Sequence, residues 1–232
     1  MFYYYLDFID DDFLLFLSFA GAIALAMVLG IAFHEFCHAW SASLLGDQTA
    51  ASQGRLTLNP LAHLDPLGTF LLVLAGFGWG KPTPVNPYRL RNGRTGMAVV
   101  AAAGPISNLA VAAVLAVPIR LGWAPFHTPF AAFVNTAGWE TSDYIGLFLT
   151  SGILINCILA VFNLLPIAPL DGFKIWVGVL PIELARPIAQ LERYGMFILL
   201  ALFFLAPAIG VNFFGGIVRP TVNEIAGWLT GV

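Results

Sequence analysis

The chain has 232 residues, of which 59% are hydrophobic and only 10% are charged. Soluble domains carry about 25% charged residues, so this composition is typical of a membrane protein that crosses the bilayer several times. The formal net charge of -3 is too small to indicate nucleic acid as a partner, and the two cysteines do not make a disulfide framework.

Four long uncharged runs predict membrane-spanning helices. They are Phe13 to Phe33, Met97 to Ile119, Tyr144 to Leu170 and Tyr194 to Val218. Each has about 21 to 27 residues, and about 20 residues suffice for a helix to cross the hydrocarbon core. We therefore expect an all-α polytopic membrane protein with a single membrane-embedded domain over residues 1–232. Its core covers about 13–175, and an additional transmembrane segment covers about 194–218.

A small β element is expected between the first two spans. Arg55 to Leu58 alternates polar and apolar residues, which is typical of a short strand. The apolar run from Leu67 to Gly80 has only about 14 residues and several glycines, which favours a re-entrant or interfacial segment. Three prolines within residues 81–88 exclude a helix there and favour an extended path.

Basic residues in the short loops predict the orientation. Lys81, Arg89, Arg91 and Arg94 lie in one loop, whereas the N-terminal segment holds four aspartates and no basic residue. Because Lys and Arg gather on the cytoplasmic side, we expect residues 44–96 and 171–193 inside and residues 120–143 outside, in the cell membrane. The first and third spans then run parallel, and both end at the cytoplasmic face.

Two histidines four residues apart lie at the end of the first apolar run, in the sequence HEFCH. On a helix, His34 and His38 share one face and can bind one Zn²⁺, while Glu35 beside them can take a proton from water. Unpartnered ionisable groups are costly within a membrane span. This cost favours one zinc ion per chain over the alternative, a helix-packing network without metal.

A catalytic zinc site usually has a third protein ligand. The candidates are His63, His127, Cys37 and Asp171. Asp171 is favoured because it follows the third apolar run at the same predicted face as the histidines. Pro166 and Pro169 interrupt that run, and an unwound backbone there can turn the carboxylate toward the first helix. The alternative is an ordinary aspartate at the lipid headgroups.

Two asparagines within the apolar runs are further candidates. Asn108 follows a Gly-Pro pair that can break or kink its helix. It can donate a hydrogen bond to the oxyanion of a substrate, or it can join two helices. Asn163 can position substrate or bond to backbone freed near Pro166, and the structural role is favoured.

Six segments together resemble the site-2 protease family of intramembrane zinc metalloproteases, peptidase family M50. They are HEFCH, Asn59-Pro60, HLDPLGT at 63–69, GWGKPTPVNP at 78–87, GPISN at 104–108 and NLLPIAPLDG at 163–172. The resemblance covers residues 30–175, in the family's order and spacing. It implies the compact form, without a PDZ or CBS domain, and a core of three transmembrane helices. It also implies that His34, His38 and Asp171 bind zinc, that Glu35 is catalytic, and that transmembrane protein substrates are cleaved.

The alternative from another class is a zinc-binding membrane protein that does not cleave, such as a metal transporter or a pseudoprotease. Transporters often show paired repeats and polar residues spread over several spans. Here the polar groups gather at one depth and include Glu35, which favours the protease. An unwound substrate could pair with an extended edge supplied by residues 48–59 or 76–88. The oligomeric state is left open.

Overall fold

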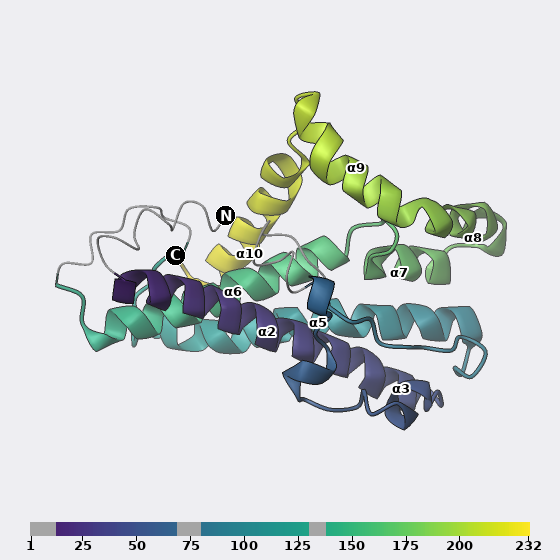
Figure 1. The fold of residues 1–232 in the computed structure, drawn as a ribbon, viewed down its shortest axis with the longest axis horizontal. Helices are drawn as coiled ribbons and strands as arrows, with labels where there is room; N and C mark the ends of the chain where they lie inside the picture. Colours follow the sequence, from purple (N-terminus) through teal and green to yellow (C-terminus); the bar gives the residue numbers. More distant parts are fainter. Residues whose placement is uncertain (1–12, 69–79, 130–137) are drawn as a thin grey trace.

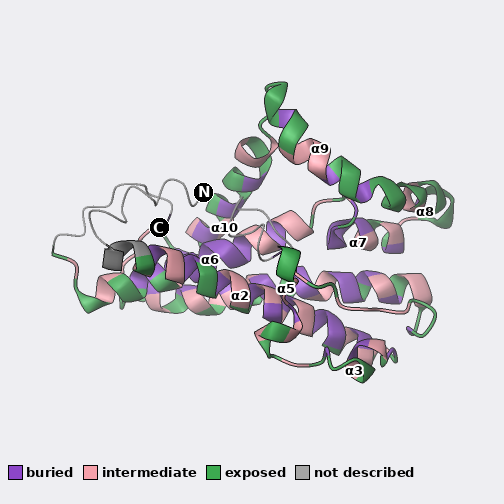
Figure 2. Ribbon diagram, viewed as in Figure 1, coloured by how far each residue is buried: buried purple, intermediate pink, exposed green. Residues whose placement is uncertain are grey.

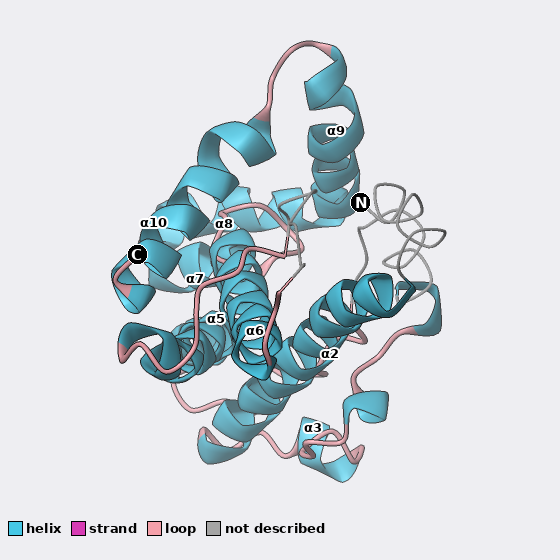
Figure 3. Ribbon diagram, turned by 90° about the vertical axis from the view of Figure 1, so that its left-hand side faces the viewer, coloured by secondary structure: helices cyan, strands magenta, loops and turns pink. Residues whose placement is uncertain are grey.

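The computed structural model describes residues 13–68, 80–129 and 138–232, and these form helices and loops without a strand (Figure 3). Three long helices make the body of the molecule (Figure 1). They are α2 (Phe13–Leu44), α5 (Gly93–Arg120) and α6 (Thr141–Asn163). Each pair of these helices is in contact, and each helix contains an apolar stretch long enough to cross a membrane. The first three predicted spans are therefore confirmed as helices of spanning length.

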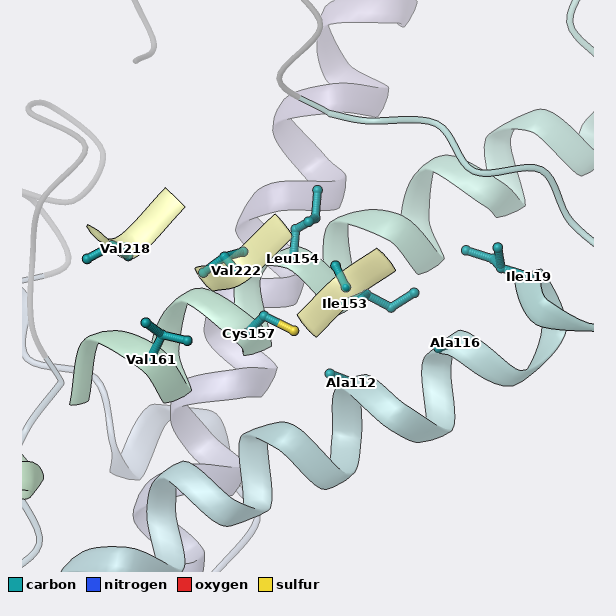
Figure 4. Close-up of a cluster of buried hydrophobic side chains, with 10 residues drawn as sticks. Ala112, Ala116, Ile119, Ile153, Leu154, Cys157, Val161, Val218 and Val222 are labelled. Carbon is teal, nitrogen blue, oxygen red and sulfur yellow. The ribbon is translucent and has the colours of Figure 1, made fainter. Parts of the chain in front are cut away.

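Small side chains allow the long helices to pack closely. In the core between α5 and α6, Ala112 and Ala116 face Ile153 and Cys157 (Figure 4). All four are fully or almost fully buried. Lipid tails are as apolar as leucine, so close packing of small residues, rather than a hydrophobic drive, holds such helices together.

The third apolar run does not remain helical to its end. Helix α6 stops at Asn163, and residues 164–170 form turns before α7 (Asp171–Val179) begins. Proline at 166 and 169 lacks the amide hydrogen that a continuing helix requires, so the chain unwinds as expected. Helix α7 then packs against α5, where Arg94 Nη1 donates to the carbonyl of Val177 at 2.9 Å.

The prediction of a single fourth span over Tyr194–Val218 is wrong. The chain continues from α7 through these elements: α8 (Ile182–Ala189), η2 (Gln190–Tyr194), α9 (Gly195–Ala208), η3 (Phe214–Val218) and α10 (Arg219–Thr230). The stretch with spanning length is Ile182–Ala208. Gly210, with a φ of 82°, allows the turn that ends α9, and α10 folds back onto α5 and α6.

The helices on the two sides of the turn at Gly210 differ in burial. Figure 2 shows α8 and α9 mostly exposed, as expected of helices that face lipid, whereas Val222 and Ala226 of α10 are buried. The guanidinium of Arg120 donates to the carbonyls of Trp228 and Leu229 at 2.7 and 3.2 Å. The last turn of α10 therefore lies beside the C-terminal end of α5.

The predicted strand at Arg55–Leu58 is also wrong. Residues 55–58 form an irregular segment with a bend at 56–57, and the β pairing among the described residues is one isolated bridge between Leu64 and Gly80. The alternation does not mark a buried apolar face, because the side chain of Arg55 is buried and bonds to the carbonyl of Lys81, whereas Leu56 and Leu58 are exposed. Two short helices lie in this connection, α3 (Thr49–Ser52) and η1 (Pro60–Ala62). Most of the predicted re-entrant segment, residues 69–79, lies outside the described residues.

Candidate metal centre

Two histidines and one aspartate meet beside the C-terminal half of α2. His34 and His38 lie one helical turn apart, and their Nε2 atoms are separated by 2.9 Å. Asp171, the first residue of α7, places Oδ2 at 3.1 Å from each of these nitrogens. All three residues are buried, with exposed fractions of 6% to 7%. Residues more than 130 positions apart in the sequence thus direct three potential ligand atoms to one point.

The spacing of these atoms fits a zinc ion. Two ligand atoms about 2.0–2.1 Å from Zn²⁺ at a tetrahedral angle lie about 3.3 Å apart. The three separations, 2.9, 3.1 and 3.1 Å, are close to that value. Two imidazoles and one carboxylate are a ligand set found in catalytic zinc sites, and three ligands leave the fourth position for water or substrate.

The remaining ring nitrogens of both histidines are held by α5. Nδ1 of His34 lies 2.6 Å from Oδ1 of Asn108, and Nδ1 of His38 lies 2.7 Å from the carbonyl oxygen of Val100. A nitrogen that faces such an acceptor carries the proton, so Nε2 of each ring keeps its lone pair for a metal. Helix α5 therefore fixes both the orientation and the tautomer of the two imidazoles.

Asn108 is fully buried, and every part of its amide is engaged. Oδ1 accepts from His34, while Nδ2 donates to the carbonyl of Gly30 at 3.2 Å and to Oδ1 of Asn156 at 2.8 Å. Asn156 in turn donates to the carbonyl of Gly152. This arrangement supports the role between helices and leaves no free donor for a substrate oxyanion.

Asn163 makes a local bond in the structure. Its Nδ2 donates to the carbonyl of Leu159, one turn earlier on α6, at 2.9 Å. Contact of Asn163 with substrate stays a prediction.

Sequence reasoning missed the reason for the glycine in GPISN. A Cβ atom at Gly104 would lie 2.5 Å from Nε2 of His38 and 2.6 Å from Nε2 of His34. The backbone of α5 thus passes directly against the face where the ligand atoms converge. The helix also continues without a break through Pro105, so the glycine serves this close approach rather than a helix end.

The carboxylates of the site have distinct surroundings. A carboxylate oxygen of Glu35 lies within 4.8 Å of one ring nitrogen of His34 and one of His38, and Oε2 accepts the backbone amide of Thr83 at 2.8 Å. Oδ1 of Asp171 faces Nζ of Lys174 at 3.7 Å.

The other candidates for the third ligand are engaged elsewhere. His127 pairs with Asp143 at 2.7 Å, at the opposite end of α6 from Asp171. His63 is fully buried, with Nε2 at 2.8 Å from the carbonyl of Thr57. Cys37 is a buried free thiol next to His38, and adjacent residues of a helix point in different directions. Among the four candidates, the structure brings Asp171 to the histidines.

Two imidazoles and a carboxylate around one point, with a glutamate beside them, define a metal-dependent hydrolase class of site. The family model described as "Peptidase family M50" matches residues 127–206. The chain is 39% identical over 187 residues to "Putative zinc metalloprotease YwhC" of Bacillus subtilis, which covers 81% of this chain and 82% of the relative.

Two further relatives carry the name "Putative zinc metalloprotease Rip2". The one from Mycolicibacterium smegmatis is 30% identical over 206 residues, which is 85% of this chain and 73% of the relative. The one from Mycobacterium tuberculosis strain H37Rv is 31% identical over 208 residues, with coverage of 86% and 73%. No solved structure matches the chain significantly. The chain belongs to peptidase family M50, the site-2 protease family, and is an integral, multi-pass membrane metalloprotease.

Proposed function

We propose that the protein is an intramembrane zinc endopeptidase that cuts substrates within or near their transmembrane segments. The observation that carries this proposal is the convergence of three ligand atoms from α2 and α7, with Glu35 directly after His34 on α2. In regulated intramembrane proteolysis, such a site would act on membrane proteins while both enzyme and substrate remain in the bilayer.

His34, His38 and Asp171 would hold one Zn²⁺. Zinc bound there supplies Lewis-acid chemistry, because it makes water more acidic and stabilises negative charge on a carbonyl oxygen. Glu35 takes a proton from the attacking water and later passes it to the amine that leaves. Asn108 keeps the His34 ring in place during these steps through its bond to Nδ1.

The substrate must unwind before it can be cut. A peptide bond in a transmembrane helix is already hydrogen-bonded and is covered by neighbouring turns. Residues near the cut that weaken a helix, such as Gly, Asn or Pro, should therefore speed cleavage. A regular poly-leucine span that is cut as fast as one bearing these residues would contradict this expectation.

The site is proposed to lie near the cytoplasmic face of the cell membrane. Its elements lie beside the loops that carry most of the basic residues, including Arg94 at the start of α5 and Lys174 on α7. A position near that face also gives water a short path to the site.

The variant Glu35→Gln tests the proposal. We expect cleavage of a transmembrane substrate in proteoliposomes to fall by at least about 100-fold, because the general base is lost. Zinc content should stay at that of the wild type. The matched control is Glu183→Gln, an exposed glutamate on α8, which should cleave normally. Undiminished cleavage by Glu35→Gln would contradict the mechanism, and a wild type that binds zinc without cleaving would support the non-proteolytic alternative.

A further inference from the structure

One short segment lies directly against Glu35. Residues 80–87, here called the strap, run along α2 with Gly80 seated on Ile31, where a Cβ would lie 2.8 Å from Cγ2 of that side chain. The amide of Thr83 donates to Oε2 of Glu35 at 2.8 Å. The hydroxyl of the same threonine donates to the backbone carbonyl of Glu35 at 3.1 Å. Thr83 is thus hydrogen-bonded to both the side chain and the backbone of Glu35.

The sequence around Thr83 makes this contact specific. Pro82 and Pro84 lack an amide hydrogen, so Thr83 supplies the only backbone donor among these three residues. Each proline also fixes its own φ and restricts the residue before it to extended conformations. The strap therefore presents one donor from a stiff backbone.

Buried residues anchor the strap on both sides of Thr83. On one side, the amide of Lys81 donates to the carbonyl of His63 at 2.7 Å, and the guanidinium of Arg55 donates to the carbonyl of Lys81. On the other side, the amide of Asn86 donates to Oδ2 of Asp47 at 2.6 Å. The three anchoring residues, His63, Arg55 and Asp47, are buried, so the strap is fixed to the interior rather than to solvent-exposed groups.

We infer that Thr83 is a positioning residue for the general base. Its amide holds Oε2 of Glu35, which leaves the other carboxylate oxygen to receive the proton. Glutamate has several rotatable bonds, and an unrestrained side chain would occupy the reactive geometry for only part of the time. The inference rests on the proposed role of Glu35, and it assigns the prolines, Arg55 and Asp47 a common purpose.

Amide hydrogen exchange tests the contact itself. In wild-type protein loaded with zinc, the Thr83 amide should exchange slowly, although the strap lies in a loop. Glu35→Ala removes the acceptor and should raise its exchange rate at least about tenfold, whereas Glu35→Gln keeps an oxygen acceptor and should raise it less. A Thr83 amide that exchanges equally fast in wild type and Glu35→Ala would overturn the inference.

Kinetics test the consequence for catalysis. Thr83→Pro removes both donors and should lower kcat by about 10- to 100-fold, with KM and zinc content close to wild type. Thr83→Ser keeps both donors and should restore kcat, and Thr83→Val keeps the amide and should lie between them. Glu183→Gln serves again as the control, since that exposed glutamate lies on α8, outside the strap.

The outcomes separate this inference from the proposed function. If Glu35→Gln is inactive while Thr83→Pro cleaves like wild type, the proposed protease function is supported and the positioning role of Thr83 is wrong. If Thr83→Pro loses zinc or fails to fold, the comparison of Thr83→Ser with Thr83→Val and the exchange measurement still decide. A loss that appears only in KM would also overturn the inference, because a displaced base slows the chemical step.

Discussion

Two histidine–aspartate contacts lie at opposite ends of α6, and they differ in burial and in the number of histidines that the aspartate meets. Near the C-terminal end, Asp171 meets two histidines, and all three side chains are buried. At the N-terminal end, His127 pairs with Asp143 at 2.7 Å, with both side chains 23% exposed. Trp139 stacks on the His127 ring at a centroid distance of 4.6 Å.

The partners of each aspartate explain the difference. Oδ2 of Asp143 accepts the amide of Glu140 at 2.8 Å, which places it in the capping box that begins α6. Its carboxylate therefore serves a helix end and one imidazole. In contrast, one oxygen of Asp171 faces two nitrogens whose other ring atoms are held by α5. The candidate metal centre is thus distinguished from the His127–Asp143 pair by the convergence of its ligand atoms and by the outer support that α5 gives to both imidazoles.

The largest expected effect is on zinc binding, which should depend on Asp171 and not on Asp143. Asp171→Ala should lose zinc, by more than the roughly 10- to 100-fold that removal of an outer partner costs. Asp143→Ala should keep one zinc per chain and cleave normally. It should lose about 1 kcal/mol of stability, because a cap of α6 is weakened. Metal analysis and thermal unfolding of the purified variants measure both. Full zinc occupancy in Asp171→Ala would show that another residue supplies the third ligand.

A second variant tests the close approach of α5. Gly104→Ala places a methyl group where the two Nε2 atoms converge, so it should displace the imidazoles and sharply reduce zinc binding. Gly21→Ala, on α2, is the control, because a Cβ there meets nothing within 4 Å. That substitution should bind zinc normally and favour the helix slightly. Normal zinc binding by Gly104→Ala would mean that the α5 backbone lies farther from the site.

Much of this site could be predicted from the sequence, because ionisable residues next to long apolar runs carry a free-energy cost in a membrane and therefore stand out. The HEFCH pair and Asp171 are ionisable groups at the ends of long apolar runs, and the prolines before Asp171 predict the unwinding that the structure contains. The role of Gly104 could not be found in the same way. A glycine beside a proline reads as a helix break, and only the packing of α5 against α2 shows what it avoids.

The fourth apolar run shows a second limit. An unbroken span and a hairpin of two apolar helices have the same composition, and Gly210 is a weak signal within Tyr194–Val218.

The strap illustrates a third limit of prediction from sequence. Prolines and glycines exclude a helix, but they do not tell which distant residue a single amide will meet.

Removal of Asn108, the hydrogen-bond partner that holds the His34 ring, should have an intermediate effect on zinc affinity. Asn108→Ala frees Nδ1 of His34 and removes the donor to Oδ1 of Asn156, so zinc affinity should fall by about 10- to 100-fold. Asn163→Ala is the matched control, since its bond to Leu159 is local to α6. Competition with a zinc chelator measures both affinities. Equal affinities in the two variants would contradict the role given to Asn108.

The smallest effect concerns the anchor of the strap. Asp47 is fully buried and accepts bonds from the amide and hydroxyl of Thr49 and from the amide of Asn86. Burial raises the pKa of the Asp47 carboxyl, but these bonds outweigh it and lower the pKa below its ordinary value. A carboxyl whose pKa is lower in the folded state stabilises the fold above its unfolded pKa of about 3.9 and loses that contribution as pH falls further.

Asp47→Asn should therefore lower the Tm at pH 7 by about 2–4 °C, the change that 1 kcal/mol makes in a chain of this size. Its deficit relative to wild type should shrink as pH falls below about 4, because the wild-type carboxyl then becomes neutral as well. Asp65→Asn is the control, with a carboxylate that caps the separate turn at Gly68. A deficit that stays constant down to pH 3 would mean that the charge of Asp47 does not stabilise the strap, and that its geometry alone does.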